Sequence, residues 1–434
     1  MRLFVRRILC DSRRTPFSTK SPKESIKDVG TYGDRKTIEL CGRKISEDDW
    51  TNITPRILDH IGRNIYLQKN HPLSILRQKI IDYFYSNYLG HRGTPVFSVY
   101  ETLSPLVTTV QNFDSLLIEK DHPSRRKSDC YYIDRDHLLR AHMTAHQAEL
   151  IKSGLDRFLM IGDVYRRDEI DATHYPVFHQ VDAVRLFTGT ELHGDRWGSN
   201  GKSLFGNGTR THDCQECHDE MSVKLVEMDL KTCLMGLTRS LFGKGISHRW
   251  TETYFPFTHP SWELEIDFNG EWMEVLGCGV VEQSILKKAG ASDRIGWAFG
   301  LGLERLAMLL FNIPDIRLFW SKDSGFLSQF KEGTITKYKP ISQFPQCIND
   351  ISFWLPNDKF SANDFYDLVR VIGGDIVEQV SLVDEFTHPK SGKKSHCYRI
   401  VYRHMEKTLT QEEVNAIHSK IEKNASETLG VIVR

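Results

Sequence analysis

The run Trp297-Ala298-Phe299-Gly300-Leu301-Gly302-Leu303-Glu304-Arg305 is the most informative stretch of the sequence. It predicts a buried strand that ends in alternating glycines and continues directly into an apolar helix. Glycine allows the backbone to approach a flat or phosphorylated ligand closely. The arginine at the start of the helix offers a permanently charged fork to phosphate oxygens. The run therefore predicts a phosphate-binding junction, with plain strand–helix packing as the competing interpretation.

A second candidate phosphate-binding element lies upstream. The apolar segment from Phe158 to Val164 predicts a strand that ends in Tyr165-Arg166-Arg167-Asp168-Glu169. After a loop, the chain returns as a second predicted strand from Phe178 to Val184. We expect the two strands to pair in antiparallel fashion.

The period of two residues places Phe178, Gln180 and Asp182 on one face of the returning strand. An aromatic and polar face beside a terminal arginine suits a nucleotide. Phe178 would stack on the base, and Arg166 would contact the α-phosphate.

These motifs resemble the second and third signature motifs of class II aminoacyl-tRNA synthetases, and most closely those of the single-chain mitochondrial phenylalanyl-tRNA synthetases. The resemblance extends from Asp121 to Arg434. The runs that carry it, besides the two already quoted, are His142-Met143-Thr144-Ala145-His146-Gln147, Phe178-His179-Gln180, Tyr254-Phe255-Pro256-Phe257-Thr258-His259-Pro260 and Glu274-Val275-Leu276-Gly277-Cys278-Gly279.

The resemblance implies an α+β fold in which a class II synthetase catalytic domain with an antiparallel sheet precedes a ferredoxin-like anticodon-binding domain. We predict a transit peptide at 1–30, the catalytic domain at 36–325, a linker at 326–340 and the ferredoxin-like domain at 341–434. The pattern of that last unit independently predicts the order β-α-β-β-α-β. Its strands are predicted at 348–355, 377–386, 396–402 and 431–433, and its helices at 361–372 and from Thr410 onward.

Further elements of the catalytic domain follow from periodicity and turn signals. Amphipathic helices are predicted at 72–88 and 222–242, and a strand at 131–139. A further helix is predicted to begin at Thr144, where Thr144 and Gln147 have the spacing of a capping box, and to end at Gly154. Asn269-Gly270 predicts a tight hairpin turn. The segment 188–218 is rich in Gly, Asn and Asp, and we interpret it as a surface insertion.

Composition limits the possible partners. The chain has 434 residues, 40% of them apolar and 26% charged, which is ordinary for a soluble globular protein. It contains no apolar stretch long enough for a membrane span. The formal net charge is zero, so an RNA partner cannot be argued from bulk charge. Nine scattered cysteines indicate reduced thiols and not a disulfide framework.

The N-terminus has the composition of a mitochondrial transit peptide. Residues 1–20 carry six Lys and Arg residues and a single acid, Asp11, with apolar residues between them. A basic arm that remains on the protein is the alternative. With the resemblance, this pattern predicts the mitochondrial matrix as the location.

The resemblance implies catalytic roles for Arg166 at the α-phosphate and Arg305 at the γ-phosphate of ATP. Glu274 would contact ATP or its Mg²⁺ through a hard carboxylate oxygen. The residues expected to bind ATP are Arg166, Asp168, Thr173, His174, Tyr175, Phe178, Glu274, Phe299 and Arg305.

For the amino acid, Phe255 and Phe257 stand one residue apart in an extended segment, so their rings would face the same side. Aromatic rings pack favourably against a phenyl group. The residues that the resemblance assigns to phenylalanine are His142, Thr144, Ala145, His146, Gln147, Gln180, Val181, Asp182, Phe255 and Phe257.

The resemblance thus implies a monomeric phenylalanine–tRNA ligase that uses ATP and Mg²⁺ and charges tRNA(Phe), without a membrane association. The ferredoxin-like unit is slightly acidic overall, which argues against a general RNA-binding patch. Its basic residues nevertheless concentrate in one part of the sequence, and we expect the tRNA contacts there: Lys390, Lys393, Lys394, Arg399 and Arg403.

Two rival functions remain open at this point. A non-catalytic RNA-binding relative would be expected to lose the ATP arginines, yet Arg166 and Arg305 are both present. A haem or zinc protein could use Cys214-Gln215-Glu216-Cys217-His218, which has the spacing of covalent haem attachment. We interpret that match as coincidence, because no second cysteine pair accompanies it.

Overall fold

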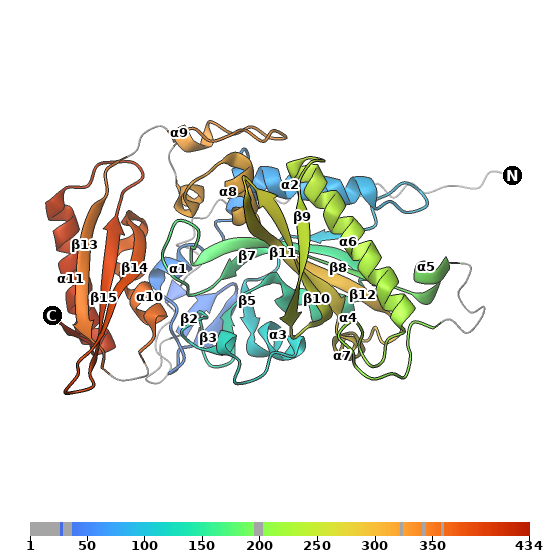
Figure 1. Ribbon diagram of the computed structural model, residues 1–434, viewed down its shortest axis with the longest axis horizontal. Coiled ribbons are helices and arrows are strands. Elements are labelled where there is room, and N and C mark those ends of the chain that lie inside the picture. The colour runs from blue at the N-terminus through green and yellow to red at the C-terminus, as the bar shows by residue number, and fades with distance from the viewer. Residues whose placement is uncertain (1–26, 29–36, 195–202, 322–323, 341–343, 357–359) are drawn as a thin grey trace.

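The computed structural model describes residues 27–28, 37–194, 203–321, 324–340, 344–356 and 360–434. Two sheets organise the chain, a seven-stranded sheet in the N-terminal part and a four-stranded sheet at the C-terminal end (Figure 1). The predicted α+β class with two successive domains is confirmed. Nearly all of the predicted transit peptide, residues 1–30, lies outside the described residues.

The large sheet has the strand order β4-β7-β8-β12-β11-β10-β9. Every neighbouring pair is antiparallel except β4 and β7. The bounds are β4 Ser98–Tyr100, β7 Arg157–Tyr165, β8 Val177–Phe187, β9 His248–Phe255, β10 Thr258–Phe268, β11 Glu271–Val281 and β12 Ile295–Gly302. The predicted antiparallel pair on either side of the Arg166 loop is therefore β7 and β8, and β12 pairs with β8 on its other side.

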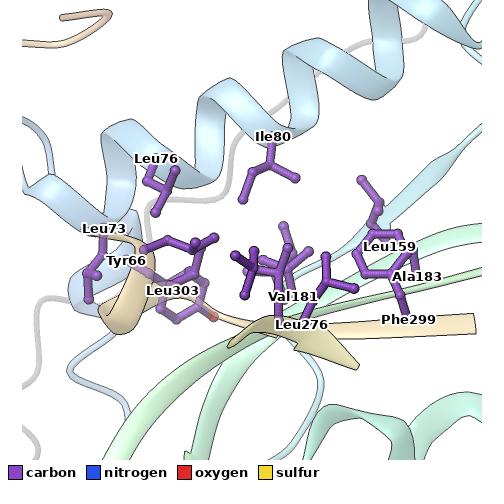
Figure 2. Packing of buried hydrophobic residues seen from close by; sticks show 14 of the residues in the cluster. Tyr66, Leu73, Leu76, Ile80, Leu159, Val181, Ala183, Leu276, Phe299 and Leu303 are labelled. Carbon is purple, nitrogen blue, oxygen red and sulfur yellow. The ribbon is translucent and has the colours of Figure 1, made fainter. Parts of the chain in front are cut away.

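Three helices cover one face of this sheet: α2 (Pro72–Asn87), α6 (Glu220–Phe242) and α8 (Leu303–Phe311). Helix α2 begins with a proline and directs Leu73, Leu76 and Ile80 toward the strands, and these side chains are completely buried. Figure 2 shows them opposite Val181 of β8, Phe299 of β12 and other side chains of the sheet. This is the main hydrophobic core, and it confirms both predicted amphipathic helices.

The opposite face of the sheet is covered only in part. Helices α4 (Gln147–Lys152) and α7 (Gln283–Lys288) pack there on β7, β8 and β12. The rest of that face borders a cavity. Successive residues of one strand thus alternate between the core and the cavity, so one face of the sheet is packed and the other borders the cavity.

Two local predictions have different outcomes. The Asn269-Gly270 turn joins β10 to β11 with φ angles of 58° and 89°, as expected for the predicted tight turn. The capping box at Thr144 is wrong. Residues Met143–His146 form a 3₁₀ turn before α4, and the Thr144 hydroxyl donates instead to Asp182 Oδ2 at 2.6 Å.

The predicted strand at 131–139 is also wrong over most of its length. Only β6 (His137–Leu139) is a strand, and it pairs with β5 (Leu106–Thr108). Asp134 accepts hydrogen bonds from the backbone N–H groups of Asp136 and His137, which turns the chain sharply. The remaining short elements are β1 (Lys27–Asp28), β2 (Thr37–Leu40), β3 (Arg43–Ser46), α1 (Pro55–Leu58), α3 (Thr109–Asn112) and α5 (Gly189–His193).

The C-terminal unit has the predicted order β-α-β-β-α-β and the sheet order β14-β15-β13-β16. Thr410 caps its second helix, with both bonds of the predicted capping box present. The bounds are β13 Cys347–Trp354, α10 Ala362–Gly373, β14 Val377–Thr387, β15 Lys394–Tyr402, α11 Gln411–Leu429 and β16 Ile432–Val433. The ferredoxin-like arrangement is confirmed.

The C-terminal unit packs against the catalytic domain through charged side chains on α10. Asp367 is buried and accepts a hydrogen bond from Tyr131 at 3.0 Å, and its carboxylate lies 3.3 Å from Arg167. Arg370 donates to the backbone oxygens of Asp168 and Glu169. The loop between β7 and β8 is therefore held by the C-terminal unit, which Figure 1 shows beside the large sheet.

The segments predicted as linker and as surface insertion are packed. Helix α9 (Ser324–Leu327) overlaps the start of the predicted linker, 326–340, where Phe326, Phe330 and Tyr338 are buried in the main core. Residues 195–202 of the insertion lie outside the described residues, but Leu204, Cys214 and His218 are buried. Glycine and polar content misled the prediction here, because buried side chains fix these loops. Among the helices of the described ranges, none is both long and apolar enough to cross a membrane.

Candidate active site

A cavity of about 640 Å³ opens on the partly covered face of the large sheet. Strands β8, β11 and β12 form its floor, and the connection from β9 to β10 forms one wall. The predicted site residues that line it are His142, Thr144, Gln147, Arg166, Asp168, Gln180, Asp182, Phe255, Phe257, Glu274 and Phe299.

Arg166 follows β7 directly and is fixed in two ways. Its Nε donates to the backbone oxygen of Ala141 at 2.8 Å, and its guanidinium carbon lies 5.1 Å from the centre of the Phe178 ring. No hydrogen bond within the described ranges uses its two terminal nitrogens. Arg166 therefore offers a fixed pair of charged N–H donors to the cavity, which is the geometry that a phosphate group requires.

Arg305 and Glu274 lie together at the edge of the cavity. Arg305 lies in the first turn of α8, and its Nη1 is 3.6 Å from Glu274 Oε2, with both side chains half exposed. Burial, together with the nearby carboxylate of Glu263, raises the pKa of Glu274 although Arg305 opposes the shift. Glu263 and Glu274 both line the cavity and repel each other.

Three polar side chains that line the cavity carry buried atoms without a hydrogen-bond partner among the described residues. Both ring nitrogens of His142, both amide atoms of Gln147 and the Oδ1 atom of Asp182 are buried without a hydrogen bond to the described residues. Buried polar groups are nearly always hydrogen-bonded, and orphaned ones are costly. Their convergence indicates a site for a small ligand that has both donor and acceptor groups.

Burial dominates the ionisation of these groups. It raises the pKa of Asp182 to about 7, although the Thr144 hydroxyl and Arg166 lower it. It lowers the pKa of His142 to about 3, so this imidazole is neutral. Gly300 lies directly beneath the carboxylate, because a Cβ there would stand 2.8 Å from Asp182 Oδ1.

An aromatic wall adjoins the orphaned polar groups. The rings of Phe255 and Phe257 are stacked with centroids 5.7 Å apart, on the side predicted from their spacing. A Cβ at Gly277 would lie 2.7 Å from the Phe255 ring, so only glycine leaves room for it. Ala298 completes this apolar part of the cavity.

Two family models cover most of the chain. The model described as tRNA synthetases class II core domain (F) matches residues 58–195 and 214–330, and the ferredoxin-fold anticodon binding domain matches 342–434. Among curated proteins, the chain is 57% identical over 422 residues to "Probable phenylalanine--tRNA ligase, mitochondrial" of Drosophila melanogaster, covering 92% of each chain. It is 55% identical to the mitochondrial phenylalanine–tRNA ligase of Mus musculus, over 91% of this chain and 88% of that one.

The chain belongs to the mitochondrial phenylalanine–tRNA ligases. The family extends to Saccharomyces cerevisiae, whose mitochondrial enzyme is 40% identical over 88% of this chain and 92% of its own. The resemblance drawn from the motifs is confirmed, as are the class II catalytic domain and the anticodon-binding fold.

Four residues predicted to contact ligands in this ligase have side chains that face away from the cavity. Val181 and Phe299 lie on the core face of their strands, where the Phe299 ring packs 6.1 Å from Phe84 (Figure 2). Only the peptide backbone of Phe299 can border the cavity. Ala145 is buried in a separate apolar cluster, and His146 contacts Arg140 Nη1 at 3.1 Å. We withdraw the proposed ligand contacts of these four side chains.

The loop from Thr173 to Tyr175, predicted to bind ATP, does not line the cavity. Tyr175 is buried, and its hydroxyl contacts His60 Nε2 at 3.0 Å and Asp375 Oδ1 at 2.9 Å. Thr173 and His174 are bonded to Asp171, and this contact raises the pKa of His174. The prediction for Tyr175 is wrong because the side chain is part of the interface with the C-terminal unit.

The predicted tRNA-binding residues fall into two groups. Lys390, Lys393 and Lys394 are exposed at the turn between β14 and β15. Arg399 forms two hydrogen bonds of 2.8 Å with Asp350, and Arg403 lies 3.1 Å from Glu378. The two arginines are thus engaged in ion pairs within their own domain.

Sequence reasoning missed several residues around the cavity. Asn363 of α10 lines it, although it belongs to the C-terminal unit, and Arg167 and Asp129 stand beside it. Tyr254 also lines the cavity and is 75% exposed, so it stands at the mouth. Arg167 and Tyr254 lie in quoted motifs, whereas Asp129 and Asn363 could be found only from the tertiary packing.

The Cys214-Gln215-Glu216-Cys217-His218 run is a structural turn. His218 Nε2 lies 2.9 Å from Gln283 Oε1, so that nitrogen is already in use. In the described ranges, the ligand atoms of Cys214, Cys217 and His218 do not come within 4.8 Å of one another, a distance that Asp168, Glu169 and His174 do meet. The geometry therefore offers no support to the zinc alternative.

Proposed function

We propose that this ligase activates phenylalanine with ATP to form phenylalanyl-adenylate and pyrophosphate, and then transfers the phenylalanyl group to tRNA(Phe). The observation that carries this proposal is the position of the orphaned polar groups of His142, Gln147 and Asp182 beside the Phe255–Phe257 wall. The polar groups suit an ammonium and a carboxylate, and the rings suit a phenyl side chain.

The activation step requires the amino-acid carboxylate to attack the α-phosphorus of ATP. Arg166 lines the same cavity as the orphaned groups, where it would neutralise charge that develops on the α-phosphate. Arg305, beside Glu274, would hold the γ-phosphate. Positioning and electrostatics do this work, so no covalent enzyme nucleophile is needed.

A Mg²⁺ ion fits the carboxylates at the same edge. Glu263 and Glu274 both border the cavity. Burial and, after it, repulsion from Glu263 raise the pKa of Glu274, and a divalent cation would relieve that repulsion. When bound, the ion would neutralise phosphate charge. The family and the N-terminal composition support a location in the mitochondrial matrix, and the single-chain family supports a monomer.

Pyrophosphate exchange with each proteinogenic amino acid in turn tests the proposed activity. We expect exchange that depends on phenylalanine and falls strongly for leucine. Exchange that responded to a different amino acid would contradict the proposed substrate.

The affinity for phenylalanine is expected to depend on Asp182. Because burial raises its pKa to about 7, the carboxyl is largely protonated below that pH and gains its charge above it. Only the charged form attracts the ammonium group, so the KM for phenylalanine should fall as pH rises from about 6 to about 8. Asp182→Asn should raise this KM by about tenfold or more and flatten the pH dependence. An unchanged pH profile in the variant would contradict the role, and the KM for ATP serves as the internal control.

The open face of the four-stranded sheet is our candidate for the tRNA contact. Trp354 and Phe386 flank Ser395 on neighbouring strands, with their rings 6.1 Å apart, and the Arg434 guanidinium lies 5.0 Å from the Trp354 ring. Aromatic side chains on an open four-stranded sheet stack on unpaired RNA bases in other proteins of similar topology. The exposed lysines of the β14–β15 turn lie at the same end of the sheet.

Replacing Lys393 and Lys394 with glutamate should weaken tRNA charging. The slope of the logarithm of tRNA affinity against the logarithm of salt concentration should become shallower by about one unit per lost phosphate contact. Trp354→Ala should weaken charging without that change of slope, because stacking is not screened by salt. Pyrophosphate exchange should be unaffected in both variants. Charge reversal of Lys420 and Lys423 on α11 is the matched control, and an equal loss there would contradict the assigned face.

A further inference from the structure

We propose that Gln215 is a positioning residue. It joins the start of β10 to the end of β11 and thereby fixes the Phe255–Phe257 wall, which is the proposed pocket for the phenyl group. The inference rests on the proposed function of the Phe255–Phe257 wall as that pocket. It gives a role to the Cys214-Gln215-Glu216-Cys217-His218 run, which the catalytic chemistry does not use.

The segment that carries Gln215 is held by its own backbone. Gly206 and Gly208 donate to the backbone oxygens of Cys217 and Glu216 at 3.0 and 2.9 Å, which forms a compact loop. The N–H of His218 donates to the oxygen of Gln215 at 3.0 Å. Gln215 is 2% exposed, so its side chain is fixed inside the protein and cannot be a surface group.

The Gln215 amide forms three hydrogen bonds, all with backbone groups of neighbouring elements. Its Nε2 donates to the backbone oxygens of His259 at 2.8 Å and Val281 at 3.1 Å. Its Oε1 accepts from the backbone N–H of Gln283 at 2.8 Å. A single side chain thus joins β10 near its start, the last residue of β11 and the first residue of α7.

These anchor points lie next to the backbone that carries the aromatic wall. The N–H of Glu282, between two of the Gln215 partners, donates to the oxygen of Phe257 at 3.0 Å. Thr258, next to Phe257, pairs with Val281 in the β10–β11 ladder. A displacement at Val281 to Gln283 would therefore be transmitted directly to the Phe257 backbone.

Neighbouring contacts support the same anchor. Arg210 forms an ion pair with Glu282, and His259 Nε2 lies 2.8 Å from the backbone oxygen of Thr211. Gln215 does not itself line the cavity. Its effect on the substrate must pass through the backbone that carries the Phe255 and Phe257 rings, so it is not a catalytic residue.

Gln215→Leu is the direct test, because leucine keeps most of the volume and removes all three hydrogen bonds. We expect the KM for phenylalanine in pyrophosphate exchange to rise by about tenfold, which corresponds to the loss of buried hydrogen-bond partners. The preference for phenylalanine over tyrosine should fall, while the KM for ATP should not change. His212→Ala, an exposed position three residues away, is the control and should behave as the parent protein does.

Gln215→Glu separates positioning from general stability. The glutamate keeps the acceptor but turns a carboxylate toward two carbonyl oxygens, so its pKa should be raised. At about pH 6 a protonated carboxyl can donate to one of them, and the phenylalanine KM should move back toward that of the parent measured at the same pH. If Gln215→Leu does not fold, the phenylalanine KM of Gln215→Glu still tests whether Gln215 positions the aromatic wall.

Two results would overturn the inference: a parental phenylalanine KM and tyrosine discrimination in folded Gln215→Leu, or equal losses for phenylalanine and ATP in both variants. Failure of the proposed substrate is a separate outcome. If the parent protein activated a different amino acid, the KM for that amino acid in Gln215→Leu would still test the anchor.

Discussion

Arg166→Ala is expected to reduce phenylalanine-dependent pyrophosphate exchange by about 10²–10³-fold, the usual effect of removing one fixed donor from a transition-state contact. The arginine is anchored by a single Nε–H bond to Ala141 and by the Phe178 ring, which leaves its two terminal nitrogens for the α-phosphate. The alanine variant lacks this charge, and a water molecule cannot supply the lost N–H donors in the same fixed geometry. The fold should persist, because the side chain borders the cavity and, within the described ranges, donates a hydrogen bond only to Ala141.

The comparison for this variant is Arg135→Ala, which removes a surface arginine that is 61% exposed. Its exchange rate should be close to that of the parent protein. Arg305→Ala should also lose exchange, because it removes the contact with the γ-phosphate. Near-parental exchange in folded Arg166→Ala would remove the basis for placing ATP at this edge of the sheet.

Asp367→Ala is expected to destabilise the protein by about 1–3 kcal/mol, because it removes the buried carboxylate that Tyr131, Arg167 and Arg370 share, although Arg167 keeps Asp364 as a counter-charge at 2.9 Å. Asp367 is 6% exposed and accepts from Tyr131 at 3.0 Å, while Arg167 and Arg370 lie 3.3 and 3.7 Å from its carboxylate. Removal of the carboxylate would leave the buried Tyr131 hydroxyl without its acceptor and Arg370 without a carboxylate partner among the described residues, while Arg167 would still pair with Asp364. Denaturant unfolding, followed by circular dichroism, measures the loss.

Asp49→Ala is the matched control, since Asp49 pairs with Arg135 on the surface and is 73% exposed. Surface ion pairs contribute about 0–1 kcal/mol, so this variant should be nearly as stable as the parent. Equal stability of Asp367→Ala and Asp49→Ala would show that the interface charges are solvated and not paired.

The sequence alone determined the elements whose signals are local. The hairpin at Asn269-Gly270, the helix that begins at Pro72 and the capping box at Thr410 were predicted from a few neighbouring residues. Each depends on backbone conformation or on contacts within one turn, which is why sequence spacing was sufficient. The motif residues that stay on one strand face, such as Gln180 and Asp182, were placed correctly for the same reason.

Only the tertiary structure decided which neighbours of those residues face the ligand. Val181 and Phe299 belong to the quoted motifs, but strand alternation and the packing of α2 direct both into the core. Tyr175 was assigned to ATP, yet the C-terminal unit supplies Asp375 as its partner from 200 residues away. The insertion was predicted to lie on the surface, and Gln215 is buried because it finds carbonyl partners on β10 and β11. Contacts between residues distant in sequence depend on how the sheet, helices and domains pack, and no local pattern encodes them.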